Sequence, residues 1–225
     1  MISAQQILGL NDQHVVQLDD KHRLQPAVKK AFLAMQKAAS FEGHDLQIAS
    51  SYRSFSQQAS IWNRKWNGEL KLNTLDGDVL DTKSLSDVQK MHAILLWSAL
   101  PGGSRHHWGT DFDIYDRAKV AACGAPFELV TEEYESNGPC AELAKWVLVN
   151  AAKFGFELPY AEYAGGVAAE PWHLSYTPIA SQIITAFSVE LLRKQLIESG
   201  ILGLDTVLLH LNSLFERYTL NRGSK

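Results

Sequence analysis

The sequence predicts a single α+β domain, because segments with helical and with strand-like periodicity alternate irregularly along its 225 residues. No internal repeat, low-complexity run or linker divides the chain, and its length suits one large domain. Hydrophobic residues make up 46% and charged residues 20%, as in an ordinary globular protein. We therefore treat residues 1–225 as one domain, large enough to fold around its own core.

Charge and composition exclude some classes of partner. The formal net charge is −4 and the pI is about 6.1, whereas a nucleic-acid-binding surface is normally basic. The first ten residues lack the basic and apolar regions of a secretory signal, and no run approaches the roughly 18 apolar residues of a membrane helix. We expect no nucleic acid, no membrane span and a cytoplasmic location; a periplasmic or cell-envelope location would need an export route that the sequence does not display. Cys123 and Cys140 are too few for a disulfide framework, so we expect two reduced thiols rather than a pair.

The first part of the chain predicts a helix followed by a strand. Residues 25–40 carry apolar side chains at helical spacing, with Pro26 in the first turn. Gly43 follows at a suitable helix end. Residues 46–52 alternate between apolar and polar side chains, as a half-buried strand does, and lead directly into Arg53.

Two further helices are expected before residue 100. Ser54 or Ser56 can cap the first of them, which carries Trp62 and Trp66. Residues 67–82 have no period and are rich in Gly, Asn and Asp, so we expect a long loop. Residues 84–87 resemble a capping box that opens a helix to about residue 100. The predicted apolar stripe of this second helix consists of Val88, Met91, Leu95 and Ala99.

The second half of the chain continues the mixed pattern. We expect strands at 111–115, 155–160 and 172–176, an irregular insertion at 118–139, and helices at 140–154, 178–197 and 202–220. The last two helices present leucines that either pack onto the domain or form a dimer face, namely Leu191, Leu192, Leu196, Leu208 and Leu211. The choice between monomer and homodimer stays open at this point.

The stretch from Ser104 to Asp113 concentrates groups that can hold a metal ion. It contains two histidines and two aspartates, and it follows Pro101-Gly102-Gly103, which is typical of a tight loop. In a strand of period two, Asp111 and Asp113 share one face while Phe112 and Ile114 share the other. Two buried acids beside a histidine pair require positive charge nearby, so a cation site is expected here.

A second chemical segment lies at Glu170 and His173. The proline that follows Glu170 disfavours a helix at this point, so we expect Glu170 on an extended turn before a strand. Together with His106 and Asp113, His173 completes a mixed His and Asp set of three ligands, the pattern of catalytic zinc with one open position. Glu170 supplies a carboxylate a few residues from one ligand, where it can act on a metal-bound water.

These motifs resemble the zinc D,D-peptidases of the VanY and VanX type. The resemblance consists of Ser50-Ser51-Tyr52-Arg53-Ser54, Ser104-x-His106-x-x-Gly109-x-x-x-Asp113 and, about sixty residues later, Glu170-x-x-His173, all in the family's order. It covers residues 46–176, leaving the helices at 178–220 to pack on this motif core. That family shares its fold with the hedgehog signalling domain, which implies a central, mostly antiparallel sheet flanked by helices.

The resemblance implies a role for each motif residue. One Zn²⁺ per chain would be held by His106, Asp113 and His173, with Glu170 as the general base and then acid. Arg53 would hold the scissile carbonyl oxygen as charge develops on it. Ser104 would bind the substrate, at its C-terminal carboxylate. The candidates for the remaining pocket wall are Tyr52, Gln58, Trp108 and Trp172.

The chain departs from the family pattern at Asp111, where alanine is usual. Strand parity places Asp111 on the side of Asp113, where it can orient a ligand imidazole. The rival assignment makes Asp111 the ligand and Asp113 its support, but the motif register favours Asp113. The register likewise favours His106 over His107, which becomes a candidate for the rim, for substrate contact or, like Asp111, for support behind the ligands.

The resemblance implies a zinc-dependent D-alanyl-D-alanine carboxypeptidase acting on peptidoglycan stem peptides or their precursors. Two other enzyme activities fit the same motifs: a D-Ala-D-Ala dipeptidase and an L,D-carboxypeptidase acting on muropeptides. A non-catalytic zinc-containing binding domain, as in the hedgehog branch, is the third alternative.

Overall fold

A four-stranded antiparallel sheet lies at the centre of the computed structural model, which describes residues 2–223. The strand order is β3-β4-β6-β5, with β3 at Leu46–Ser50, β4 at Asp111–Asp116, β5 at Phe156–Glu157 and β6 at His173–Tyr176. The two central strands come from segments about sixty residues apart in the chain. The predicted antiparallel sheet with flanking helices is confirmed.

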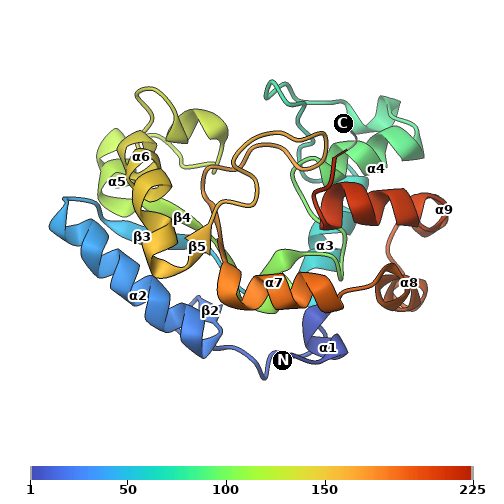
Figure 1. The fold of residues 1–225 in the computed structure, drawn as a ribbon. Coiled ribbons are helices and arrows are strands. Elements are labelled where there is room, and N and C mark those ends of the chain that lie inside the picture. The colour runs from blue at the N-terminus through green and yellow to red at the C-terminus, as the bar shows by residue number, and fades with distance from the viewer. Residues whose placement is uncertain (1, 224–225) are drawn as a thin grey trace.

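One face of the sheet is covered by α2 (Pro26–Phe41) and α6 (Ala141–Asn150) (Figure 1). Val28, Phe32 and Met35 of α2 are fully buried, as the helical spacing predicts. They meet Phe112 and Ile114 of β4 in one apolar cluster, and the rings of Phe32 and Phe112 pack edge to face at 5.3 Å. The apolar face of β4 is therefore turned away from Asp111 and Asp113.

A second apolar cluster is built by helices on the other side of the molecule (Figure 1). These helices are α1 (Ala4–Ile7), α3 (Phe55–Trp66), α4 (Asp87–Leu95), α7 (Thr177–Ala186), α8 (Val189–Ile197) and α9 (Leu204–Leu214). Leu192, Leu196 and Leu211 are buried in this cluster with Trp62 and Leu95. The leucines of the last helices therefore pack onto the domain, the first of the two readings above.

The order of the predicted helices is correct, but several limits are wrong. The capping box of α4 is formed by Ser86 and Gln89 rather than by Ser84, and the helix ends at Leu95 instead of near residue 100. Val88, placed in the apolar stripe, is 41% exposed. The single helix expected at 178–197 is interrupted at Phe187, because Ser188 adopts an extended backbone and caps a new helix by accepting from the Leu191 N–H.

Short elements account for the remaining differences. A two-stranded ribbon, β1 (Val16–Gln17) with β2 (Arg23–Leu24), was not expected. The insertion expected to be irregular contains α5 (Arg117–Cys123) and a 3₁₀ turn, η3 (Thr131–Tyr134). The other 3₁₀ turns are η1 (Thr82–Ser84), η2 (Arg105–Trp108) and η4 (Ala151–Phe154), and η5 (Phe215–Thr219) is a short π-helix that continues α9.

Two composition-based expectations can be compared with the described residues. Cys123 is exposed and Cys140 is buried, and both are free. None of the helices in residues 2–223 has the length and the apolar character that crossing a membrane requires.

Candidate metal centre and active site

The pairing of β4 with β6 brings the two chemical segments together. Asp113 lies directly opposite His173 in the antiparallel register, and Asp111 lies opposite Ser175. Residues that face each other across an antiparallel pair have their Cβ atoms about 5 Å apart. The sheet therefore places an aspartate and a histidine from distant parts of the chain in contact.

The second histidine is delivered by η2, immediately before β4. Gly109 ends this turn in the left-handed conformation, with φ 65°. A Cβ at this position would lie 2.3 Å from Val15 Cγ1, so both the backbone and the space demand glycine. This is the physical reason for the Gly in the motif: it turns the chain from His106 into the strand that carries Asp113.

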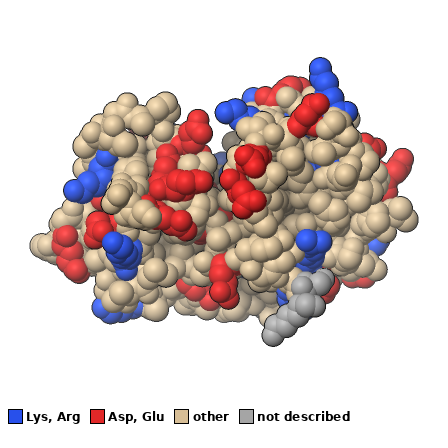
Figure 2. Space-filling model, turned by 90° about the horizontal axis from the view of Figure 1, so that it is seen from above, with Lys and Arg blue, Asp and Glu red and all other residues tan. Residues whose placement is uncertain are grey.

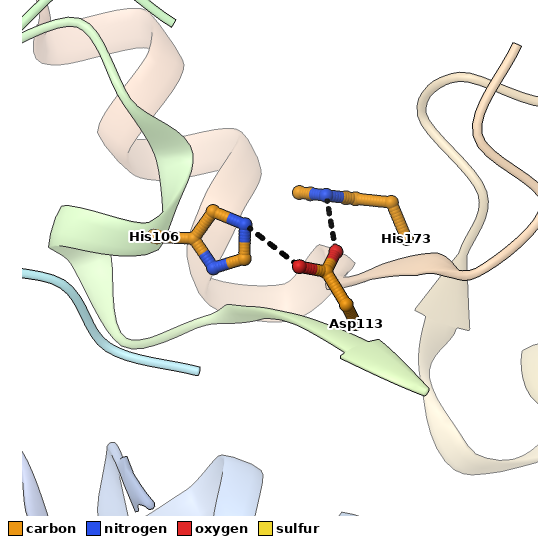
Figure 3. A group of neighbouring side chains, drawn as sticks. All are labelled: His106, Asp113 and His173. Atoms are coloured by element: carbon orange, nitrogen blue, oxygen red, sulfur yellow. Dashed lines mark ion pairs between the residues drawn. The ribbon is translucent and has the colours of Figure 1, made fainter. Parts of the chain in front are cut away.

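His106, Asp113 and His173 form one buried group (Figure 3). Nε2 of His106 lies 3.5 Å from Oδ2 of Asp113, and Nδ1 of His173 lies 3.1 Å from Oδ1 of the same carboxylate. One ligand atom from each residue falls within 4.8 Å of the other two. The spacing suits three ligands around one metal ion.

The other nitrogen of each imidazole has a partner behind it. Nδ1 of His106 donates to the carbonyl oxygen of Ser51 at 2.9 Å, and Nε2 of His173 lies 3.2 Å from Oδ1 of Asp111. Since these partners accept protons, the nitrogens that face Asp113 carry lone pairs whenever the rings are neutral, as metal-binding imidazoles are. Lone pairs opposed to a carboxylate at such distances need a positive charge between them, either a metal ion or, at His173, a proton.

The charges in this group lead to the same conclusion. Burial lowers the pKa of His106 to about 4, which keeps this ring neutral. Burial also acts to lower the pKa of His173, but the carboxylates of Asp111 and Asp113 beside the ring outweigh it and raise the pKa to about 9. Among the described residues, Oδ1 of Asp113 is buried without a hydrogen-bond partner, because its contact with His173 lacks the geometry of one. The His and Asp donors fit a zinc ion at this point.

Glu170 lies at the edge of this group. Its N–H donates to the carbonyl oxygen of Tyr160, and its own carbonyl oxygen accepts from the N–H of His173, which holds the turn before β6. Oε2 of Glu170 is 3.5 Å from Nδ1 of His173. Burial raises the pKa of the Glu170 carboxyl to about 7, a value suited to exchanging protons near neutral pH.

Arg53 follows β3 by three residues and also lines the site. Its guanidinium donates to Oε1 of Gln58 at 2.7 Å and to Oγ of Ser50 at 3.1 Å. An irregularity in the β3–β4 register between Ile48 and Ser50 precedes it and redirects the chain toward the site. Burial lowers the pKa of Arg53, while Asp113 and Glu170 oppose that shift.

A buried ion pair lies behind the metal centre, next to His173. Nε of Arg105 donates to Oδ1 of Asp111 at 2.6 Å, and Nη2 of Arg105 donates to Oγ of Ser175 at 2.6 Å. Arg105 thus spans the cross-strand pair next to Asp113 and His173. Sequence reasoning missed Arg105, although an arginine between the serine and the histidine of the motif, with an extra acid six residues later, was an available signal.

A cavity of about 690 Å³ opens onto the metal centre. Arg53, Lys65, Ser104, Glu170 and Trp172 line it near the centre, and Trp172 stacks on Trp97 at 6.5 Å. Carboxylates line its outer part, and Figure 2 shows acidic side chains on both sides of a hollow in this face. The outer acidic residues of the cavity are Asp76, Glu128, Glu132 and Glu135.

Three predicted wall residues lie outside the cavity lining. Tyr52 packs edge to face against His14 and donates its hydroxyl to the carbonyl oxygen of Asn11, so it faces the β1–β2 side. Trp108 is fully buried in the helical cluster, where it packs against Phe187. Gln58 is buried as well and contacts the guanidinium of Arg53. Aromatic and amide residues near a motif serve packing as readily as binding.

The expectation for His107 as a rim residue is wrong, because the ring is fully buried. Its Nδ1 donates to the carbonyl oxygen of Arg53 at 2.6 Å, and its Nε2 accepts from the N–H of Gly102 at 3.1 Å. Burial lowers its pKa to about 3, which keeps the ring neutral with the proton on Nδ1. His107 links the loop before η2 to the backbone of Arg53.

An antiparallel sheet carrying a His, Asp and His set beside a buried glutamate defines the class of metal-dependent hydrolases. The family model described as "VanY: D-alanyl-D-alanine carboxypeptidase" matches residues 21–179, which is more than half of the chain. The protein belongs to the VanY family and is a D-Ala-D-Ala carboxypeptidase of the metallopeptidase type. The resemblance of the three motifs is thereby confirmed.

Individual proteins are similar to this chain in sequence or in fold. An uncharacterized protein of Haemophilus influenzae is 36% identical over 121 residues, which is 53% of this chain and 92% of that protein. A crystal structure of a glutamate-to-alanine mutant of VanY, the D,D-pentapeptidase of the VanB-type vancomycin resistance cassette, in complex with Zn(II), is 26% identical. The match to this VanY structure has a TM-score of 0.54 and covers 76% of the present chain and 84% of the VanY chain. VanYB in complex with D-Ala-D-Ala is 22% identical with a TM-score of 0.54, over 84% and 91% of the two chains, and shares the fold.

Proposed function

We propose that this protein uses zinc to remove the terminal D-alanine from peptidoglycan stem peptides or their precursors, with Glu170 as the general base. One observation carries the proposal: the carboxylate of Glu170 and the three-residue ligand set meet at the inner end of one cavity. A purely structural metal site is normally closed by four protein ligands, whereas this set has three and adjoins a cavity. The related VanY enzyme was crystallised with Zn(II), which supports the choice of metal.

Each residue of the site has a proposed task. Zinc, when bound, supplies Lewis acidity and makes hydroxide available near neutral pH. Glu170 accepts a proton from the attacking water and delivers it to the amine of the leaving D-alanine. Arg53 donates to the carbonyl oxygen as negative charge develops on it, and Gln58 and Ser50 fix the guanidinium for this purpose. Ser104 and Trp172 contact the substrate from the cavity wall.

Asp111 is proposed to orient His173 rather than to bind the metal. It lies behind the imidazole, on Nε2, while the ligand set is formed by the atoms on the other side. Asp111 stays ionised, because burial alone would raise the pKa of this carboxyl, but the Arg105 guanidinium together with His173 and Thr110 more than reverses that shift. A hydrogen-bonded carboxylate raises the basicity of a ligand histidine and fixes its tautomer.

The test is to incubate the zinc-loaded protein with a stem pentapeptide, a stem tetrapeptide and free D-Ala-D-Ala, and to weigh the products by mass spectrometry. We expect the pentapeptide to lose one D-alanine faster than the other two react. Preferred cleavage of the tetrapeptide would instead make the protein an L,D-carboxypeptidase, and preferred cleavage of D-Ala-D-Ala would make it a dipeptidase. Loss of D-alanine from none of the three would overturn the carboxypeptidase assignment.

A further inference from the structure

One cation of the cavity has no role in the account above. Lys65 lies in the last turn of α3 and lines the cavity together with Arg53 and Glu170. The neighbouring residue Arg64 is exposed and pairs with Glu69 at 3.7 Å, as a surface charge does. Two successive basic residues of one helix therefore lie in different surroundings, one on the surface and one inside the site.

The helix explains why Lys65 reaches the site. Gln58, Trp62 and Lys65 are separated by four and three residues and lie on one stripe of α3. Gln58 and Trp62 are fully buried, and Gln58 binds the guanidinium of Arg53. Long helical side chains lean toward the helix N-terminus, which here is the direction of Gln58 and Arg53. The stripe thus directs the Lys65 ammonium toward the inner end of the cavity.

Lys65 lines the cavity, yet among residues 2–223 its ammonium has no carboxylate partner within 4.0 Å. Burial lowers its pKa to about 8, an effect that Glu170 opposes and Arg53 assists. The side chain is still mainly an ammonium at neutral pH. An ammonium held in a partly desolvated site without a fixed partner is favourable chiefly when an anion arrives.

We propose that Lys65 binds the free carboxylate at the C-terminus of the peptide substrate and so restricts the enzyme to C-terminal residues. The inference rests on the proposed function, in which Arg53 holds the scissile carbonyl oxygen. The terminal carboxylate of the leaving residue lies one residue beyond that carbonyl, within about 4 Å along the chain. A second positive group close to Arg53 can therefore reach the terminal carboxylate, and Lys65 lines the same cavity as Arg53.

The charges around the inner end favour this occupant. At the inner end Arg53 and Lys65 balance Asp113 and Glu170, and Arg105 balances Asp111, so a bound divalent cation would make this end positive and attractive to an anion. An ammonium acts as a compact point charge that tolerates several carboxylate orientations, which suits a small leaving group. Ser104 lines the same cavity and can add a neutral hydrogen bond to the carboxylate.

The test compares two substrates that differ only at the terminal group, a stem pentapeptide and its C-terminal amide. We expect the wild type to prefer the free acid, and Lys65→Met to lower kcat/KM for the acid by about 10- to 100-fold, mainly through KM, with little change for the amide. Lys65→Arg should restore part of the preference. Arg64→Met, which removes the adjacent surface charge, is the matched control and should leave both rates unchanged.

Two outcomes would overturn the proposal. If Lys65→Met leaves the preference for the acid intact, another group binds the carboxylate. If it lowers the two rates equally, Lys65 acts through Glu170 instead. Lys65→Gln, similar in length but neutral, replaces Lys65→Met if that variant does not fold.

Failure of the proposed function is recognised separately by a binding measurement. D-Ala-D-Ala and its C-terminal amide are titrated calorimetrically into zinc-loaded Glu170→Gln with and without Lys65→Met. If the wild type hydrolyses neither the stem pentapeptide nor its C-terminal amide, the assigned reaction is wrong. Tighter binding of the acid that depends on Lys65 would still support the carboxylate site, and equal binding of acid and amide would overturn it.

Discussion

Nε2 of His173 lies 3.2 Å from Oδ1 of Asp111, on the side of the ring opposite Asp113. Both aspartates belong to β4 and flank the same imidazole of β6, so a single strand holds the ring from two sides. The usual family pattern has alanine at the position of Asp111. This chain therefore carries an additional charged support for one of its proposed ligands.

Replacing this support should weaken the metal site more than the fold. We expect Asp111→Asn to lower zinc affinity by about 10- to 100-fold, because the neutral amide no longer raises the basicity of His173. Competition with a coloured chelator measures the change. Asp45→Asn, which alters a surface aspartate paired with Arg117, is the control, and its affinity should equal that of the wild type. Equal affinities in all three proteins would remove Asp111 from the site.

The pair of Arg105 and Asp111 should be coupled in stability. Arg105→Met leaves the Asp111 carboxylate buried without its cation, and we expect the free energy of unfolding to fall by about 3–5 kcal/mol. The double variant Arg105→Met/Asp111→Leu removes both charges and should be more stable than Arg105→Met alone. Urea unfolding of the metal-free proteins gives these values. If the loss of stability in the double variant equals the sum of the losses in Arg105→Met and in Asp111→Leu alone, the ion pair is not coupled.

Activity should depend on the ionisation of Glu170. Its pKa is raised to about 7 from an ordinary value of 4.5, so the carboxylate form needed by a base is lost as the pH falls through this range. We expect kcat/KM for the stem pentapeptide to decline between pH 7 and pH 5 while zinc stays bound. A flat profile over these two units would contradict the assignment of Glu170 as the base.

The buried ring of His107 should make the protein less stable in acid. Its pKa is lowered to about 3 in the folded protein, against 6.5 in an unfolded chain. Below pH 6.5 the unfolded chain therefore binds a proton at this ring that the folded protein does not bind. The free energy of unfolding falls as a result by up to about 1.4 kcal/mol per pH unit. Urea unfolding of wild type and His107→Gln at pH 7, 6 and 5 tests this. The variant should be less stable at pH 7, yet lose less stability on acidification; parallel losses would exclude His107 as the cause.

Local patterns predicted the parts of the site that lie within one motif. The alternation around Phe112 placed Asp111 and Asp113 on one face, and the structure has Phe112 and Ile114 in the core on the other. The spacing of the family's motifs was enough to predict the three ligand residues. The helix interruption at Ser188 was missed because the apolar spacing continues through it. The Ser188 hydroxyl ends the pattern only by accepting a backbone N–H, which leaves no mark on the apolar spacing.

Contacts between distant segments could not be predicted in the same way. His107 was expected at the rim, but its partners, Arg53 and Gly102, come from a strand end and from a loop that meet only in the folded protein. Lys65 is 105 residues from Glu170 in sequence, and its direction depends on how α3 packs. Tyr52 and Trp108 adjoin motif residues yet face elsewhere, because neighbours along a strand or a 3₁₀ turn point in different directions.

The central claim is that Glu170 performs the proton transfer at a metal held by three other residues. Its most direct test measures D-alanine release from a stem pentapeptide by zinc-loaded Glu170→Ala, together with the zinc content of the same sample. The account predicts that hydrolysis falls by about 10²- to 10⁴-fold while zinc stays near one per chain. Hydrolysis within a few-fold of the wild type, at the same zinc content, would contradict it.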